Sequence, residues 1–308
     1  MERHTNGGVG AGDNRRCIVQ DRSMGIDIHR GMAMNAVRAT TTWQACWATW
    51  EPEISRRTDG LASATKIYDL GGQLGEVFAL SSSLRRDQSS VAGAGTAWEC
   101  LVCWYLNLVF SGTRAVALRQ SRLTVPKVLF DATTITYGNF QTNTESDLCV
   151  IVYPRGFEFP GEPRRYLEHL NAAVEQQLGA IEMGVIQCKT NWNENAQIPM
   201  LWDMVYQASF GAGTSVKVGR GGYAVDHLAK FTYSFVTVPT QKRDFNVASM
   251  PVKRTRGLSG GNYWGRPSKD GVALSVADIF NRNFKSAFDT DVKSSIAAAI
   301  AAKQGLFA

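Results

Sequence analysis

Apolar residues follow helical spacing early in the chain and give way to strand-like runs later. Between residues 26 and 84 they recur every three or four positions, which predicts helices with a break near Glu51-Pro52. The segment that begins at Thr96, TAWECLVCWYLNLVF, is apolar on almost every side and predicts a buried helix. Short runs of β-type residues follow at 125–130 and 147–153. This order of elements predicts an α/β protein.

Helices and strands alternate in the second half of the chain. Residues 162–180 carry Pro163 where a helix would begin, apolar residues at helical spacing, and Gly179 where the helix would end. A strand is expected directly afterwards, at 181–190, so this helix would be inserted between two strands. Further helices are expected at 198–210, 276–284 and 291–303, with a strand at 231–238 and a basic glycine-rich loop after it.

The folded part is expected to be a single domain over residues 24–308. It would comprise a helical part (24–90), a central core (91–240), and a basic loop with the C-terminal helices (241–308). Residues 1–23 show no periodicity, which predicts an arm without regular structure. A chain of 308 residues, of which 44% are hydrophobic, can bury a core of this size.

The chain shows neither a membrane segment nor a secretory signal. No run of about 18 apolar residues is present, and the first residues, MERHTNGGVGAGDNRR, lack a continuous apolar stretch. A soluble, cytoplasmic protein with no membrane partner is therefore expected. Cys100 and Cys103 have CxxC spacing, but no second Cys/His pair stands at a suitable distance, so they are expected to pack as reduced thiols in a helix.

Positive charge is concentrated in one part of the sequence. The formal net charge is +6, whereas the segment 217–266 alone contains nine Lys or Arg and two Asp residues, a net charge of 9 − 2 = +7. The same segment contains tyrosines and a tryptophan, a composition typical of a surface that binds a polyanion. A solvated basic face is the alternative, and charge alone does not separate the two.

Polar residues interrupt the apolar strand GVIQCK. Because side chains alternate along a strand, Val185, Gln187 and Lys189 share one face, and this face becomes polar towards its end. A lysine at the end of a buried strand requires an anion nearby. The nearest carboxylate expected on a strand is Asp147, whereas Glu182 would lie on the opposite face.

Asp147, Gln187 and Lys189 together resemble the PD-(D/E)XK signature of restriction-endonuclease-like nucleases. An acidic residue stands at the head of one strand and a Q-x-K triplet at the end of the next, with Gln187 in place of the usual second acidic residue. The following segment, CKTNWNENAQIPMLWDMVY, looks like the one after the catalytic lysine in type II restriction endonucleases, and SGGNYWG resembles a motif nearer their C-terminus.

The resemblance implies a restriction-endonuclease-like core, a central mixed β-sheet flanked by helices, and sequence-specific hydrolysis of double-stranded DNA with Mg²⁺. It implies Asp147, Gln187 and Glu99 as metal ligands, Lys189 beside the attacking water, and a homodimer with two active sites. The residues expected to contact DNA are Asn191, Asn193, Lys253, Arg254, Arg256, Asn262, Tyr263 and Arg266.

Several alternatives stay open at this point. Thr96 and Glu99 also fit the S/T-x-x-E capping box, in which Glu99 would only cap a helix. Asp147 fits a turn cap, Gln187 a buried core amide, and Lys189 a chain reaching solvent. A non-catalytic DNA-binding protein on the same fold and a structure-selective repair nuclease are the competing functions.

Overall fold

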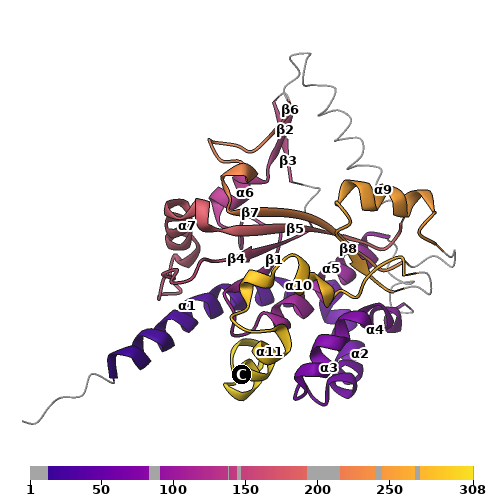
Figure 1. The fold of residues 1–308 in the computed structure, drawn as a ribbon, viewed down its shortest axis with the longest axis horizontal. Coiled ribbons are helices and arrows are strands. Elements are labelled where there is room, and N and C mark those ends of the chain that lie inside the picture. Colours follow the sequence, from indigo (N-terminus) through magenta and orange to yellow (C-terminus); the bar gives the residue numbers. More distant parts are fainter. Residues whose placement is uncertain are drawn as a thin grey trace, which may run out of the picture.

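A five-stranded mixed sheet forms the centre of the protein (Figure 1). The computed structural model describes residues 13–82, 91–137, 139–143, 147–192, 216–239, 245–267 and 271–307, with side chains from Gly25 onward. The strands of the sheet, in spatial order, are β1 (Ala115–Arg119), β4 (Leu148–Val152), β5 (Glu182–Lys189), β7 (Lys230–Thr237) and β8 (Tyr263–Gly265). β4 is antiparallel to both its neighbours, whereas β5, β7 and β8 are parallel. The expected α/β architecture with a mixed sheet flanked by helices is confirmed.

Helices cover both faces of this sheet (Figure 1). Ile186 and Cys188 of β5 pack into the larger apolar cluster, together with the helix α5 (Val91–Val109). Met183, on the other face of β5, packs with residues of α7 (Tyr166–Gln176). The larger cluster also contains residues of α2 (Thr41–Thr58), α3 (Ala64–Asp69), α4 (Leu74–Leu80), α10 (Asp278–Arg282) and α11 (Val292–Ala301). The alternation of β5 therefore separates two apolar layers, and α5 is the buried helix that its sequence predicts.

The N-terminal helices differ from the sequence-based expectation in two places. α1 spans Asp13–Arg38, so it extends into the segment 13–23 expected as an arm. α2 continues through Pro52, although proline inside a helix costs roughly 3 kcal/mol. Trp50 and Ile54, on either side of Pro52, are buried. Proline has no backbone N–H, so the carbonyl of Ala48 lacks its helical donor, but both Ala48 and Pro52 are exposed. Packing thus outweighs the lost hydrogen bond, and the chain breaks between α1 and α2 instead.

The prediction of a strand at 125–130 is wrong, because this segment forms the helix α6 (Lys127–Ala132). Pro126 precedes the first turn, and the backbone N–H of Val128 donates to Oδ1 of Asn171 at 2.9 Å. Asn171 of α7, 43 residues away, thus satisfies a backbone donor at the start of α6. With only six residues, α6 is too short for a helical period to be recognised in the sequence. The strand that the sequence did not reveal is β1, a short apolar run close behind α5.

The prediction of a basic loop after β7 is also wrong in part, because Met250–Leu258 forms the helix α9. Ser249 precedes it, Pro251 lies in its first turn, and Val252 and Thr255 are buried beneath it. The insertion helix at 162–180 is confirmed as α7, and the C-terminal helices as α10 and α11, whereas the helix expected at 198–210 lies outside the described residues.

A second, three-stranded sheet stands beside the main one. It comprises β3 (Phe140–Thr142), β2 (Ile135–Tyr137) and β6 (Val216–Val218), in that order. Single 3₁₀ turns lie at Leu70–Gly72, Leu178–Ala180, Val225–His227, Lys285–Ala287 and Gly305–Phe307. No helix in the described ranges combines the length and the apolar composition needed to cross a membrane.

Candidate functional site

Asp147 and Lys189 meet at the end of the main sheet where β4 begins and β5 ends. The two strands are antiparallel with Leu148 opposite Ile186, so the residue before β4 comes level with Gln187. Oδ2 of Asp147 accepts the backbone N–H of Cys188 at 2.7 Å and lies 3.5 Å from Nζ of Lys189. The anion that Lys189 was expected to require is therefore Asp147.

The Asp147 carboxylate is not fully compensated by its neighbours. Burial raises its pKa above the ordinary value for aspartate. The charge of Lys189, the N–H of Cys188 and the charge of Arg119 each lower this pKa, yet the net change is upward. The ionised form is thus less stable here than in water, and a further cation would stabilise it.

Glu99 projects from α5 towards the same cluster of charges. Its Oε2 accepts a hydrogen bond from Nη2 of Arg119, at the end of β1, at 3.1 Å. Burial raises the pKa of Glu99, and the negative charge of Asp147 raises it further, whereas Arg119 and Lys189 lower it. The negative charge of Asp147 therefore destabilises the ionised form of Glu99, and the cations Arg119 and Lys189 lie beside them.

The capping-box alternative for Glu99 is wrong. α5 begins at Val91, so Thr96 lies inside the helix and is not its N-cap residue. The described partner of Glu99 is Arg119, 20 residues away, and not the backbone of Thr96. The sequence predicts a later start because Gly93 and Gly95 are typical of a loop, yet both lie within the first turns of α5.

Gln187 is almost completely buried, with 1% of its surface exposed. Its Oε1 accepts a hydrogen bond from the hydroxyl of Tyr233, on the neighbouring strand β7, at 3.1 Å. This contact is what a buried core amide needs. The role of Gln187 as a metal ligand therefore stays a prediction, and Tyr233 is a neighbour that the linear pattern did not reveal.

The donor set suits a cation with few protein ligands better than a closed metal centre. In the part of the chain that the structure describes, no group of three or more His, Cys, Asp or Glu residues is placed to hold a metal ion. Asp147 and Glu99 supply two carboxylates, and Gln187 adds a neutral amide oxygen nearby. Mg²⁺ is commonly bound through one or two carboxylates and keeps several waters, so these residues fit it.

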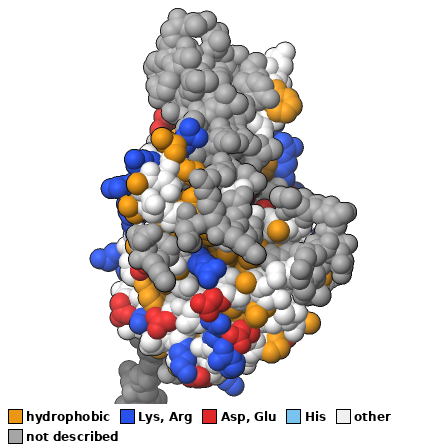
Figure 2. Space-filling view, turned by 90° about the vertical axis from the view of Figure 1, so that its right-hand side faces the viewer, with side chains coloured by type: hydrophobic (Ala, Val, Ile, Leu, Met, Phe, Trp, Pro, Cys, Tyr) orange, Lys and Arg blue, Asp and Glu red, His pale blue; other side chains and the backbone are white. Residues whose placement is uncertain are grey.

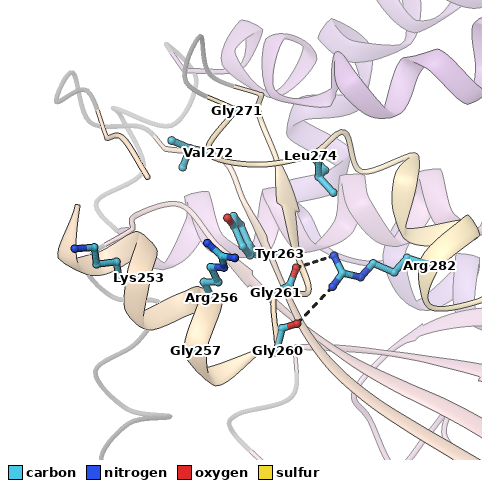
Figure 3. A pocket seen from close by; sticks show the side chains of 10 residues that line it. All are labelled: Lys253, Arg256, Gly257, Gly260, Gly261, Tyr263, Gly271, Val272, Leu274 and Arg282. Atoms are coloured by element: carbon cyan, nitrogen blue, oxygen red, sulfur yellow. Dashed lines mark hydrogen bonds between the residues drawn. The ribbon is translucent and has the colours of Figure 1, made fainter. Parts of the chain in front are cut away.

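The predicted DNA-contacting residues are divided between different places. Lys253, Arg256 and Tyr263 line an open pocket of about 650 Å³ beside α9 (Figure 3). Arg254 and Arg266 are exposed, but neither lines this pocket. Asn191 and Asn262 are half-buried, and Asn193 lies outside the described residues.

Trp192 anchors the segment that follows β5. It is 2% exposed and packs against Phe245 and Tyr263, with ring centroids 6.2 and 6.1 Å apart. Val252 of α9, Val272 and Ala273 complete this small cluster. Trp192 is therefore a core residue, and the cluster joins the end of β5 to the pocket beside α9.

Lys230 of the basic segment 217–266 lies far from the candidate catalytic site. Lys230 stands at the start of β7, opposite Glu182, whereas Lys189 lies opposite Thr237 at the other end of the same strand pair. β7 spans eight residues, so its two ends lie about 23 Å apart at the usual strand rise of about 3.3 Å per residue. On the face shown in Figure 2, Lys and Arg side chains of the described residues lie in separate groups, some of them mixed with Asp and Glu.

Comparison with protein-family models, curated proteins and solved structures finds no match for this chain.

Proposed function

We propose that this protein is a Mg²⁺-dependent endonuclease of the PD-(D/E)XK type that hydrolyses double-stranded DNA at specific sequences. The observation that carries the proposal is the meeting of Asp147 and Lys189, 3.5 Å apart, at the adjoining ends of β4 and β5. An acidic residue at the head of one strand and Q-x-K at the end of its neighbour is the arrangement that the sequence resemblance implies. The helices on both faces and Glu99 on the helix before β1 agree with it.

Electrostatics supports a cation at this place. Glu99 and Asp147 both have pKa values raised by burial, in spite of Arg119 and Lys189. Glu99 and Asp147 would hold Mg²⁺, with Gln187 as a neutral third donor. When bound, Mg²⁺ would polarise the scissile phosphate and favour ionisation of the attacking water.

The side chains of the site have separate roles in this mechanism. Lys189, with 23% of its side chain exposed, would orient the attacking water and stabilise negative charge that develops on the phosphate. Arg119 would hold Glu99 through its hydrogen bond. Asp147 would in turn position Lys189, because their side chains are already in contact.

Sequence-specific cleavage implies a DNA-binding surface and a two-fold arrangement. Most recognition sites read by symmetric proteins are palindromic, so we propose a homodimer that carries two of these sites. The pocket beside α9 provides cationic and aromatic side chains for one part of the DNA contact. Asn191, directly after β5, is the candidate nearest along the chain to Lys189.

Nicking of supercoiled plasmid DNA in the presence of Mg²⁺ tests the proposal. We expect cleavage with Mg²⁺, none with EDTA, and none by the folded Asp147→Asn variant. Glu182→Gln is the matched control, because Glu182 opens β5 at the end remote from Lys189. Failure of the wild-type protein to cut DNA of several sources would overturn the enzymatic proposal.

A non-catalytic DNA-binding protein is the second candidate, favoured by one observation. Gln187 brings no charge and already accepts a hydrogen bond from Tyr233. DNA affinity without Mg²⁺-dependent nicking would select this candidate. Cleavage that follows DNA shape, with branched DNA preferred over every linear duplex, would instead indicate a structure-selective nuclease.

A further inference from the structure

The pocket beside α9 is cationic along its length. Lys253 and Arg256 project from α9, Arg282 comes from the end of α10, and Tyr263 begins β8 (Figure 3). Lys253 lies at one end of the group, Arg256 beside Tyr263, and Arg282 at the other end (Figure 3). None of the described residues that line it is Asp or Glu. Among the described residues, no carboxylate forms an ion pair with any of these three cations.

Only one face of α9 takes part in this lining. Lys253, Arg256 and Gly257 follow one another at the three- and four-residue spacing of a single helix face, whereas Val252 and Thr255 point into the protein. Arg254 is exposed on the same helix but does not line the pocket.

Arg282 is held in place by the glycine turn after α9. Its Nη1 donates to the carbonyl of Gly261 at 3.0 Å, and its Nη2 donates to the carbonyl of Gly260 at 3.4 Å. A guanidinium has five N–H donors, so these two contacts leave others for a ligand. Gly261 has φ +84°, and a Cβ there would lie 3.3 Å from Nη2 of Arg282. A side chain at this position would be strained and would crowd the guanidinium.

The pocket lies at a defined distance from the candidate catalytic site. Gln187 of β5 is level with Phe235 of β7, which is level with Tyr263 of β8. With Asp147 opposite Gln187, three strand spacings of about 4.8 Å separate Asp147 from Tyr263, or about 14 Å. This distance corresponds to about four nucleotides of one DNA strand, whose axial rise is ~3.4 Å per nucleotide.

We infer that this pocket holds the sugar–phosphate backbone of the bound DNA a few nucleotides from the cleaved bond, with Arg256 and Arg282 contacting its phosphates. The inference rests on the proposed function and adds Arg282, which lies outside the basic segment 217–266. A volume of about 650 Å³ exceeds that of a single phosphate and suits a short stretch of strand. Tyr263 and Leu274 provide apolar surface for the sugars.

DNA binding in EDTA, measured by fluorescence anisotropy over a salt series, separates this binding mode from a general attraction to positive charge. The logarithm of affinity falls with the logarithm of salt by about 0.9 per phosphate contact. We expect Arg256→Ala and Arg282→Ala each to reduce this slope by about 0.9, and Lys230→Ala, at the remote end of β7, to leave it unchanged. Gly261→Ala, which removes no charge, should weaken binding as Arg282→Ala does, with thermal melts verifying that each variant is folded.

The outcomes distinguish this inference from the proposed function. If the wild-type protein shows no salt-dependent affinity for DNA, both are wrong. If it binds DNA and the pocket variants keep the wild-type slope, or Lys230→Ala lowers the slope equally, only the pocket assignment is wrong. A titration with AMP forms a second arm: saturable binding that Arg282→Ala abolishes, with DNA binding unaffected, would assign the pocket to a free nucleotide and overturn the inference.

Discussion

Nζ of Lys189 lies 3.5 Å from Oδ2 of Asp147, although 42 residues separate them in the chain. The helix α7 fills the interval, and the antiparallel pairing of β4 with β5 brings the two ends together. Their side chains are 23% and 15% exposed, so the pair is largely buried but can still be reached from solvent. A structural ion pair needs no such access, whereas a substrate does.

Removal of either partner should abolish most of the cleavage. We expect Lys189→Ala and Asp147→Ala each to lower the cleavage rate at least about a hundredfold, the loss typical when an electrostatic contact to a transition state is removed. Single-turnover cleavage of plasmid DNA measures the effect. Lys230→Ala is the matched control for the lysine, since Lys230 stands at the remote end of β7. Near-normal cleavage by either folded variant would remove the site assignment.

Gln187→Ala should be milder than Asp147→Ala, because only the aspartate contributes charge to a bound cation. Gln187→Glu adds a third carboxylate beside Asp147 and Glu99, so it should lower the Mg²⁺ concentration required for half-maximal cleavage. The measurement is a Mg²⁺ titration of the cleavage rate for each variant. An equal loss in Gln187→Ala and Asp147→Ala would assign Gln187 a role other than neutral ligand.

Glu99→Gln should weaken Mg²⁺ binding while the protein stays folded. Glutamine keeps an oxygen that Arg119 can donate to, but it brings no charge to the cation. We expect Mg²⁺ to raise the melting temperature of the wild-type protein, because a ligand bound only to the folded state stabilises it, and to raise that of Glu99→Gln less. The same rise in both proteins would leave Glu99 as a structural partner of Arg119 alone.

The raised pKa of Glu99 also predicts a pH dependence of stability. Between the ordinary glutamate pKa and its raised value, the folded state binds more protons than the unfolded state, so the contribution of Glu99 to the free energy of unfolding falls as pH rises. The stability of Glu99→Gln relative to wild type should therefore increase from pH 4 towards neutral pH. Urea unfolding without Mg²⁺ at several pH values measures it, and a pH-independent difference would contradict it.

His29 predicts the opposite dependence in the acid range. It is fully buried, its Nε2 donates to the carbonyl of Thr124 at 2.7 Å, and its Nδ1 accepts from Tyr153 at 2.9 Å. Burial lowers its pKa from 6.5 to about 4. The unfolded chain binds a proton below pH 6.5, whereas the folded chain does so only near pH 4, so stability is lost as pH falls through this window.

The free energy of unfolding lost through His29 is about 3 kcal/mol, because a pKa change of one unit corresponds to 1.36 kcal/mol. His29→Gln removes the titration, so its free energy of unfolding should change less than that of wild type between pH 7 and pH 4. Urea unfolding across this range compares them. Parallel pH profiles for the two proteins would show that His29 does not titrate in this way.

The features that depend only on neighbouring residues can be predicted from the sequence. Alternation along β5 placed Gln187 and Lys189 on one face, and the unbroken apolar surface of α5 required a buried helix. The need of Lys189 for an anion followed from the cost of burying an unpaired charge. Each of these follows from backbone geometry or solvation within a short segment, which is why the structure agrees with them.

Which distant side chains meet depends on the tertiary structure. Arg119 as the partner of Glu99 depends on how α5 packs against β1, and Tyr233 as the partner of Gln187 on the register of β5 with β7. Arg282 reaches the pocket only because α10 lies beside the glycine turn that follows α9. Such contacts depend on strand register and helix packing over 20 residues or more, and local periodicity contains no information about either. For the same reason the sequence predicts a strand where α6 lies and a loop where α9 lies, because packing elsewhere in the chain stabilises short segments whose own patterns are ambiguous.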